Sequence, residues 1–76
     1  MIVNERIVID PEIQHGRPVI RGTRVPVARL LSELAGGMGF EEICREYDVT
    51  SEDIRAAVAY AGELLNQESH LPLRAA

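Results

Sequence analysis

The sequence predicts a mainly α-helical protein in which three helices follow two short strands. Three observations lead to this fold class. After residue 25, apolar residues recur at intervals of three and four in three successive segments. Glycines or helix-capping residues separate these segments. Before residue 25, the apolar residues instead form two short β-branched runs.

The length of 76 residues is about half of a typical domain, so we expect one domain. Its parts are a β-arm and turn over residues 1–25, a three-helix bundle over 26–67 and a flexible tail over 68–76. The single cysteine, Cys44, allows no internal disulfide, and its spacing from His15 and His70 does not match a zinc site. We expect no cofactor or metal. Oligomerisation is then the usual way for so small a chain to gain stability.

The two strands are predicted at residues 6–9 and 19–20. The first run, Arg-Ile-Val-Ile, ends at Asp10-Pro11, and residues 15–18 are typical of a turn. Gly22 indicates a bulge or tight bend. Because two such strands are not stable alone, they must either pack on the helices or pair with a second copy of the chain.

The first helix is predicted to start at Pro26, since its fixed φ suits the first helical position. Its buried face comprises Val27, Leu30, Leu31 and Leu34, and Gly36-Gly37 ends it. The second helix is predicted over residues 40–47. Its apolar face comprises Phe40, Ile43, Cys44 and Tyr47.

The third helix is predicted to begin at a capping box formed by Thr50 and Asp53, and to fade near Gln67. Its expected buried face comprises Ile54, Ala57, Val58, Ala61, Leu64 and Leu65. The second and third helices, joined by a three-residue turn, have the layout of a helix-turn-helix unit. This layout alone does not establish DNA binding, because many three-helix bundles share it.

The charges are distributed unevenly along the chain. The net charge is −4, and every cation is an arginine. Residues 1–32 carry five arginines against three acids, whereas residues 33–76 carry three arginines against nine acids. We therefore expect the N-terminal part to attract polyanions or acidic surfaces. No apolar run approaches the roughly 20 residues of a membrane helix, which favours a cytoplasmic protein.

A long motif carries a family resemblance. It reads Gly16-Arg17-Pro18-Val19-Ile20-Arg21-Gly22-Thr23-Arg24-Val25-Pro26-Val27, followed by Gly37-Met38, Glu41-Glu42-Ile43 and Glu52-Asp53-Ile54. With these segments the chain resembles the domain-of-unknown-function family four-three-three over residues 7–65. The resemblance implies a homeodomain-like three-helix fold with an N-terminal β-arm, in a homodimer. Gly39 departs from the family, in which a serine often caps the second helix.

The resemblance also implies a function. Members look like VapB-type antitoxins, often encoded beside a toxin with a PIN-like ribonuclease fold. We therefore expect an antitoxin-like homodimer that binds and neutralises such a toxin and regulates transcription from its own operator DNA. The alternative is a homodimeric protein-interaction module without nucleic-acid binding. We do not expect an enzyme, because the sequence has no paired catalytic acid and base, phosphate loop or metal spacing.

The candidate DNA-binding residues are Arg21, Arg24, Arg29, Arg55 and Ser51. The third helix offers few of the side chains that read bases, since Glu52 and Asp53 stand at its start. If DNA is bound, we therefore expect arginines of the arm and first helix to contact phosphates, and such contacts depend on salt.

The candidate toxin-binding residues are Arg17, Arg24 and Arg74, because a guanidinium can pair with the carboxylates of a ribonuclease site. The structural alternative is that Arg21 and Arg24 brace the turn. Thr23 is expected to form a turn hydrogen bond rather than to act as a nucleophile. The expected dimer interface is the arm, through Ile7, Ile9, Val19 and Ile20.

Overall fold

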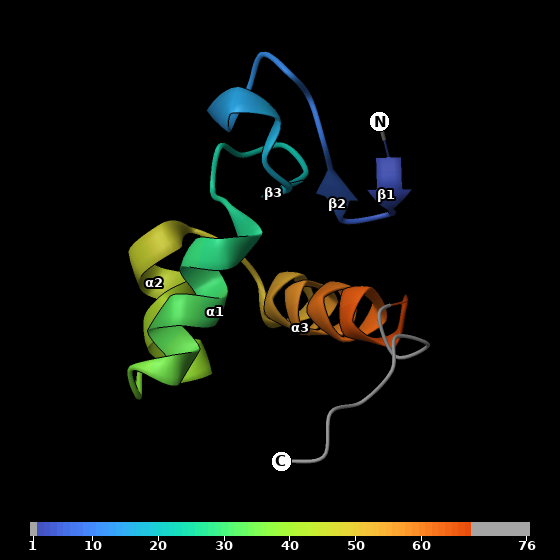
Figure 1. Ribbon diagram of the computed structural model, residues 1–76. Coiled ribbons are helices and arrows are strands. Elements are labelled where there is room, and N and C mark those ends of the chain that lie inside the picture. The colour runs from blue at the N-terminus through green and yellow to red at the C-terminus, as the bar shows by residue number, and fades with distance from the viewer. Residues whose placement is uncertain (1, 68–76) are drawn as a thin grey trace, which may run out of the picture.

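The computed structural model describes residues 2–67 (Figure 1). The tail predicted over residues 68–76, with His70 and Arg74, lies outside the described residues. The elements in chain order are β1 (Ile2–Asn4), β2 (Ile7–Val8), the 3₁₀-helix η1 (Gln14–Gly16), β3 (Val19–Ile20), α1 (Val27–Ala35), α2 (Phe40–Tyr47) and α3 (Ser51–Gln67). The mainly helical fold with an N-terminal β-arm is thus confirmed.

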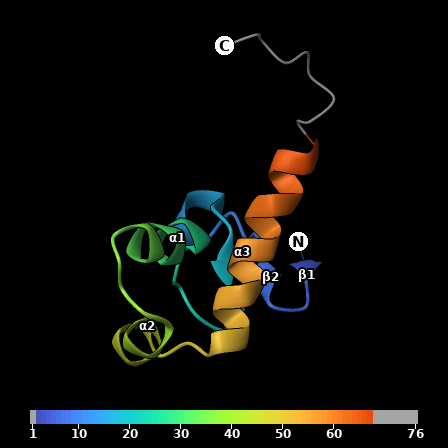
Figure 2. The same ribbon diagram turned by 90° about the horizontal axis from the view of Figure 1, so that it is seen from below.

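The helices form the predicted helix-turn-helix arrangement. α2 and α3 begin and end where the sequence predicts, with residues 48–50 between them. The turn is tight because Asp48 adopts the left-handed conformation, with φ of 55°. Seen from below, α3 lies between the pair α1 and α2 on one side and strands β1 and β2 on the other (Figure 2). The arm and the helices therefore meet along α3.

The arm is an antiparallel sheet of order β1–β2–β3 within one chain. Ile7 pairs with Ile20 and Val8 with Val19. The sequence did not predict β1, and the predicted strand over residues 6–9 is too long. Arg6 belongs instead to the turn between β1 and β2, because Oδ1 of Asn4 accepts the backbone N–H groups of both Arg6 and Ile7 at 2.8 and 2.9 Å.

The first helix begins one residue later than predicted. Pro26 has the extended ψ of 141° and precedes the helix, because its backbone forms an antiparallel bridge with Val19. The backbone N–H of Val27, the first helical residue, is not left free. It donates to the carbonyl of Pro18 at 2.9 Å, which ties α1 to the arm.

The end of α1 follows the prediction. Gly37 has a φ of +100°, a conformation that side chains resist. The N–H of Met38 donates to the carbonyl of Glu33, and the N–H of Gly37 donates to that of Leu34, both at 3.0 Å. These two bonds form a Schellman motif, which satisfies carbonyls at the helix end.

The core joins the arm to all three helices. The sheet contributes Ile7 and Ile20. The helices and the turn between α2 and α3 contribute Val27, Leu30, Ile43, Val49, Ile54 and Ala57. Of the two alternatives for the strands, the structure therefore shows packing on the helices. This packing also covers three residues of the expected dimer interface, since the side chains of Ile7, Val19 and Ile20 are 0%, 0% and 1% exposed. These side chains have no surface to offer a second copy, and Ile9 is partly buried.

The buried face predicted for α3 holds only in part. Ile54 and Ala57 are buried, but Val58, Leu64 and Leu65 are 46%, 42% and 68% exposed. The prediction is wrong for these three residues. Leu64 and Leu65 lie in the outer half of α3, which extends past the helices that cover its first half (Figure 2). Val58 lies in the first half, next to the buried Ala57 but turned toward solvent.

Candidate functional site

An ion pair connects the arm to the start of α3. Nη1 of Arg6 donates to Oδ1 of Asp53 at 2.9 Å, and the Asp53 side chain is only 13% exposed. The other carboxylate oxygen of Asp53 accepts the N–H of Thr50 at 3.0 Å, while the N–H of Asp53 donates to Oγ1 of Thr50 at 3.1 Å. The predicted capping box is thereby confirmed, and Asp53 also holds the arm in place. Sequence reasoning missed Arg6, since no local pattern links two residues so far apart.

These contacts change the acidity of Asp53. Burial raises the pKa of its carboxyl, but the hydrogen bonds from Thr50 and Arg6 outweigh burial and lower the pKa below the ordinary 3.8. Asp53 therefore stays ionised and paired, so its charge is not presented to solvent. Arg21 lies beside this pair and, with Glu5, lines the same open hollow.

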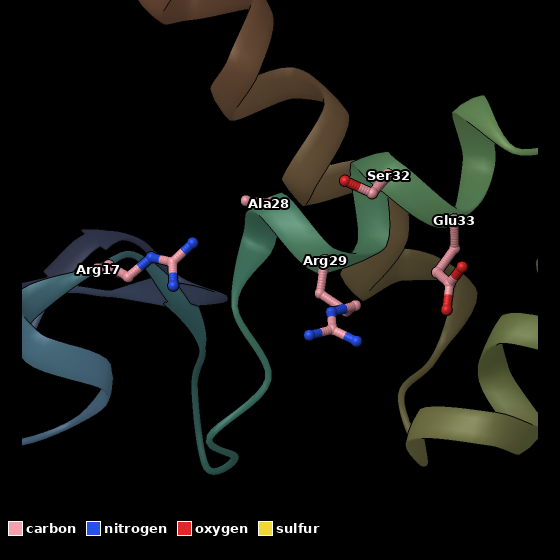
Figure 3. Close-up of a pocket in the computed structure, with 5 residues that line it drawn as sticks. All are labelled: Arg17, Ala28, Arg29, Ser32 and Glu33. Carbon is pink, nitrogen blue, oxygen red and sulfur yellow. The ribbon is translucent and has the colours of Figure 1, made fainter.

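A second hollow brings together two predicted site residues. Arg17 and Arg29, from different candidate sets, line an open depression of about 370 Å³ with Ala28, Ser32 and Glu33. Their guanidinium groups extend into it from the loop before β3 and from α1 (Figure 3). Neither arginine forms an ion pair with a residue of the described range 2–67. Two cations and a hydroxyl in one depression can bind an anionic group.

One wall of this hollow is fixed by a contact between helices. The hydroxyl of Tyr47 on α2 donates to Oε2 of Glu33 on α1. This hydrogen bond raises the pKa of Tyr47 above 10.0, and the nearby Arg29 partly opposes the shift. Because Glu33 is engaged by Tyr47, its carboxylate is directed toward α2.

Arg24 lies on a turn that is braced by its neighbours. Oγ1 of Thr23 donates to the carbonyl of Ile20 at 2.8 Å and accepts the N–H of Val25 at 2.9 Å. The expectation that Thr23 forms a turn hydrogen bond is confirmed. The carbonyl of Arg24 accepts a bond from Nε2 of Gln14, while its side chain is exposed. The braced turn thus presents Arg24 to solvent.

The start of α3 carries the other predicted DNA contacts. Ser51 is partly buried, and Glu52 and Arg55 are exposed. The guanidinium of Arg55 lies 5.9 Å from the ring centroid of Phe40, within the range of a cation–π contact. The structure does not bring Arg55 together with Arg17 and Arg29, which line a hollow formed by the arm and α1.

Within the described part of the chain, no group of three or more His, Cys, Asp or Glu side chains is placed to hold a metal ion. Nor does any helix among residues 2–67 have the length and apolar character to cross a membrane. The exposed acids of α2 and the following turn are Glu41, Glu42, Glu46 and Asp48.

Comparison with known families gives a match over most of the chain. Residues 7–61 match the family described as "Protein of unknown function (DUF433)". The chain belongs to this family. The match includes the arm from β2 onward and extends into the outer half of α3. It covers every residue that lines the hollow of Arg17 and Arg29, and two of the four, Arg21 and Asp53, that line the other.

Two curated relatives each match more than half of this chain. One is named "Putative antitoxin VapB45", from Mycobacterium tuberculosis, and is 36% identical over 52 residues, or 68% of this chain. The other is "Uncharacterized protein y4eO" from Sinorhizobium fredii, 38% identical over 58 residues, or 75% of this chain. The chain spans only 22% and 26% of the length of these relatives.

Solved structures confirm the fold of the family. The crystal structure of a DUF433 member protein from Anabaena variabilis matches with a TM-score of 0.73 and 33% identity, over 82% of this chain and 62% of that one. The crystal structure of Rv2018 from Mycobacterium tuberculosis matches with a TM-score of 0.64 and 36% identity, over 68% of this chain and 24% of that one.

Proposed function

We propose that this chain is an antitoxin-like protein, which binds and neutralises a toxin with a PIN-like ribonuclease fold. The observation that carries the proposal is the 36% identity, over 68% of the chain, to the protein named "Putative antitoxin VapB45". The exposed arginines of the arm support it, because they offer a cationic surface to an acidic partner.

Arg24 is the first candidate for contact with the toxin. Its side chain is exposed on a turn braced by Thr23 and Gln14, so it can approach a partner without first ordering a loop. A guanidinium pairs with carboxylates in a bidentate manner and can compete with the metal that a ribonuclease of this kind holds. Arg21, exposed on the same turn, can add a second cation.

The test is co-expression with the toxin encoded beside the gene, followed by co-purification and an RNA-cleavage assay. We expect the wild-type protein to co-purify with the toxin and to suppress cleavage. Arg24→Glu should weaken binding at least about tenfold, as expected when a charge at an interface is reversed. Arg45→Glu is the matched control, since Arg45 is also exposed but lies on α2. Absence of binding by the wild-type protein would refute the proposal.

A second function, binding of operator DNA as a homodimer, is favoured by the ion pair of Asp53. Because Arg6 neutralises Asp53, only one acid of the two at the start of α3 remains exposed. Phosphate contacts would come from Arg21, Arg24 and Arg29, with Ser51 and Arg55 at the start of α3.

A gel shift with the upstream DNA at increasing salt tests the second function. A variant such as Arg21→Ala, which removes one cation facing the phosphates, should reduce the steepness of the salt dependence by about one unit. If no shift occurs at low salt, the protein acts instead as a protein-interaction module without nucleic-acid binding.

A further inference from the structure

An apolar groove runs between the start of α1 and the outer half of α3. Pro18, Val27 and Leu31 line one side, and Tyr60, Ala61 and Leu64 line the other. The groove is almost free of polar surface and has a volume of about 170 Å³. Leu64 is 42% exposed there, although its helical position predicts burial.

The groove has charges of opposite sign on its two sides. On the α1 side it shares Ala28 with the hollow lined by Arg17 and Arg29, whose acid, Glu33, is engaged by Tyr47. On the α3 side it shares Tyr60 with a depression lined by Glu63 and Asn4. A cationic flank and an acidic flank therefore border the apolar groove.

We propose that a second copy of this chain covers the groove and forms the homodimer. A two-fold axis that lies in the interface and runs along the groove brings the cationic flank of each copy onto the acidic flank of the other. Apolar residues then meet at the centre, where Leu64 of each copy is shielded from water. The interface is thus complementary to itself in charge as well as in hydrophobicity.

This interface specifies the homodimer of the proposed function, on which it rests. It is also compatible with the burial of Ile7, Val19 and Ile20 within one chain, since it does not use their side chains. A core of this size leaves a small domain only marginally stable, and the added burial at the groove is a usual remedy.

The first test is sedimentation equilibrium of the full chain over a wide range of concentrations. We expect the wild-type protein to be a dimer and Leu64→Glu to raise the dimer dissociation constant at least about a hundredfold, because it places charge at an apolar centre. Leu64 is partly exposed, so this variant should keep its fold, which circular dichroism verifies. Arg45→Glu is the control and should remain dimeric.

The second test is a charge exchange across the interface. Arg17→Glu and Glu63→Arg should each weaken the dimer about tenfold, because each places like charges opposite one another. The double variant should recover most of the wild-type dissociation constant, a rescue that a purely structural role of either residue would not produce.

The outcomes separate the proposals. A wild-type monomer would overturn both this interface and the homodimer. A dimer that is insensitive to Leu64→Glu, or a double variant without recovery, would overturn this interface and leave the homodimer standing. Toxin binding is measured separately, so its absence would refute the antitoxin-like function without altering the sedimentation results.

Discussion

The guanidinium of Arg6 donates to Oδ1 of Asp53 at 2.9 Å, across 47 positions of sequence. Asp53 also forms the capping box of α3 with Thr50, and the backbone carbonyl of Arg6 accepts the N–H of Arg21 at 2.8 Å. Arg6, in the turn between β1 and β2, therefore contacts both the residue that follows β3 and the start of α3. This relationship fixes the arm against the helix that carries the proposed dimer surface.

Loss of this ion pair should destabilise the fold. Arg6→Ala leaves a nearly buried carboxylate without its cation, and we expect the free energy of unfolding to fall by about 1–2 kcal/mol, a value reduced because Arg6 is 41% exposed. Urea unfolding of the wild type and of Arg6→Ala measures this change in the free energy of unfolding. Arg21→Ala is the matched control, since Arg21 lines the same hollow without an ion pair among residues 2–67, and should change stability by less than about 0.5 kcal/mol. Equal effects of the two variants would contradict this assignment.

The stability contributed by Asp53 should disappear in acid. Because the pKa of Asp53 is lower in the folded chain than the ordinary 3.8, its carboxylate stabilises the fold fully above that value. The contribution is lost as the pH falls through the lowered pKa of the folded state. Urea unfolding of the wild type and Asp53→Asn should therefore differ by a constant amount above about pH 5, with the difference shrinking below about pH 4. A difference that shrinks already near neutral pH would contradict the lowered pKa.

Tyr47 should titrate above the usual range of a phenol. Its hydrogen bond to Glu33 favours the protonated form, so the pKa lies above 10.0. The stability from this bond is present below that pH and is lost as the pH rises through the pKa of the folded state. The difference in phenolate absorbance between the wild type and Tyr47→Phe reports the titration of Tyr47. Glu33→Gln removes the accepting carboxylate and should bring the midpoint closer to 10.0; an unchanged midpoint would exclude the hydrogen bond as the cause.

The adjacent glycines at the end of α1 should respond differently to alanine. Gly37→Ala forces a Cβ into a residue with φ of +100° and should cost about 1–2 kcal/mol. Gly36 has a helical φ of −80°, and an added Cβ would make only ordinary contacts. Gly36→Ala should therefore be neutral or stabilise the protein by up to about 1 kcal/mol, because alanine loses less backbone entropy. Thermal unfolding compares the two, and a similar decrease in Tm for both would rule out the Schellman motif as the reason.

The sequence by itself determined the features that depend on neighbouring residues. They are the capping box of Thr50 and Asp53, the glycine end of α1 and the bounds of α2 and α3. Each is set by contacts between residues at most five positions apart. Such contacts depend on the local backbone, so residue types and spacing are enough to predict them. The long motif from Gly16 to Val27 likewise indicated the family.

Only the tertiary structure decided which faces are buried and which distant side chains meet. A strand of two residues has too little alternation to reveal its buried side, so the sequence could not place Ile7 and Ile20 in the core of one chain. The helical period of α3 correctly marks one apolar side, but it cannot tell where the covering helices stop, and Leu64 is therefore exposed. The arm packs against the helices in a way that pairs Arg6 with Asp53 and places Arg17 and Arg29 in the same hollow. No spacing along the chain encodes either arrangement.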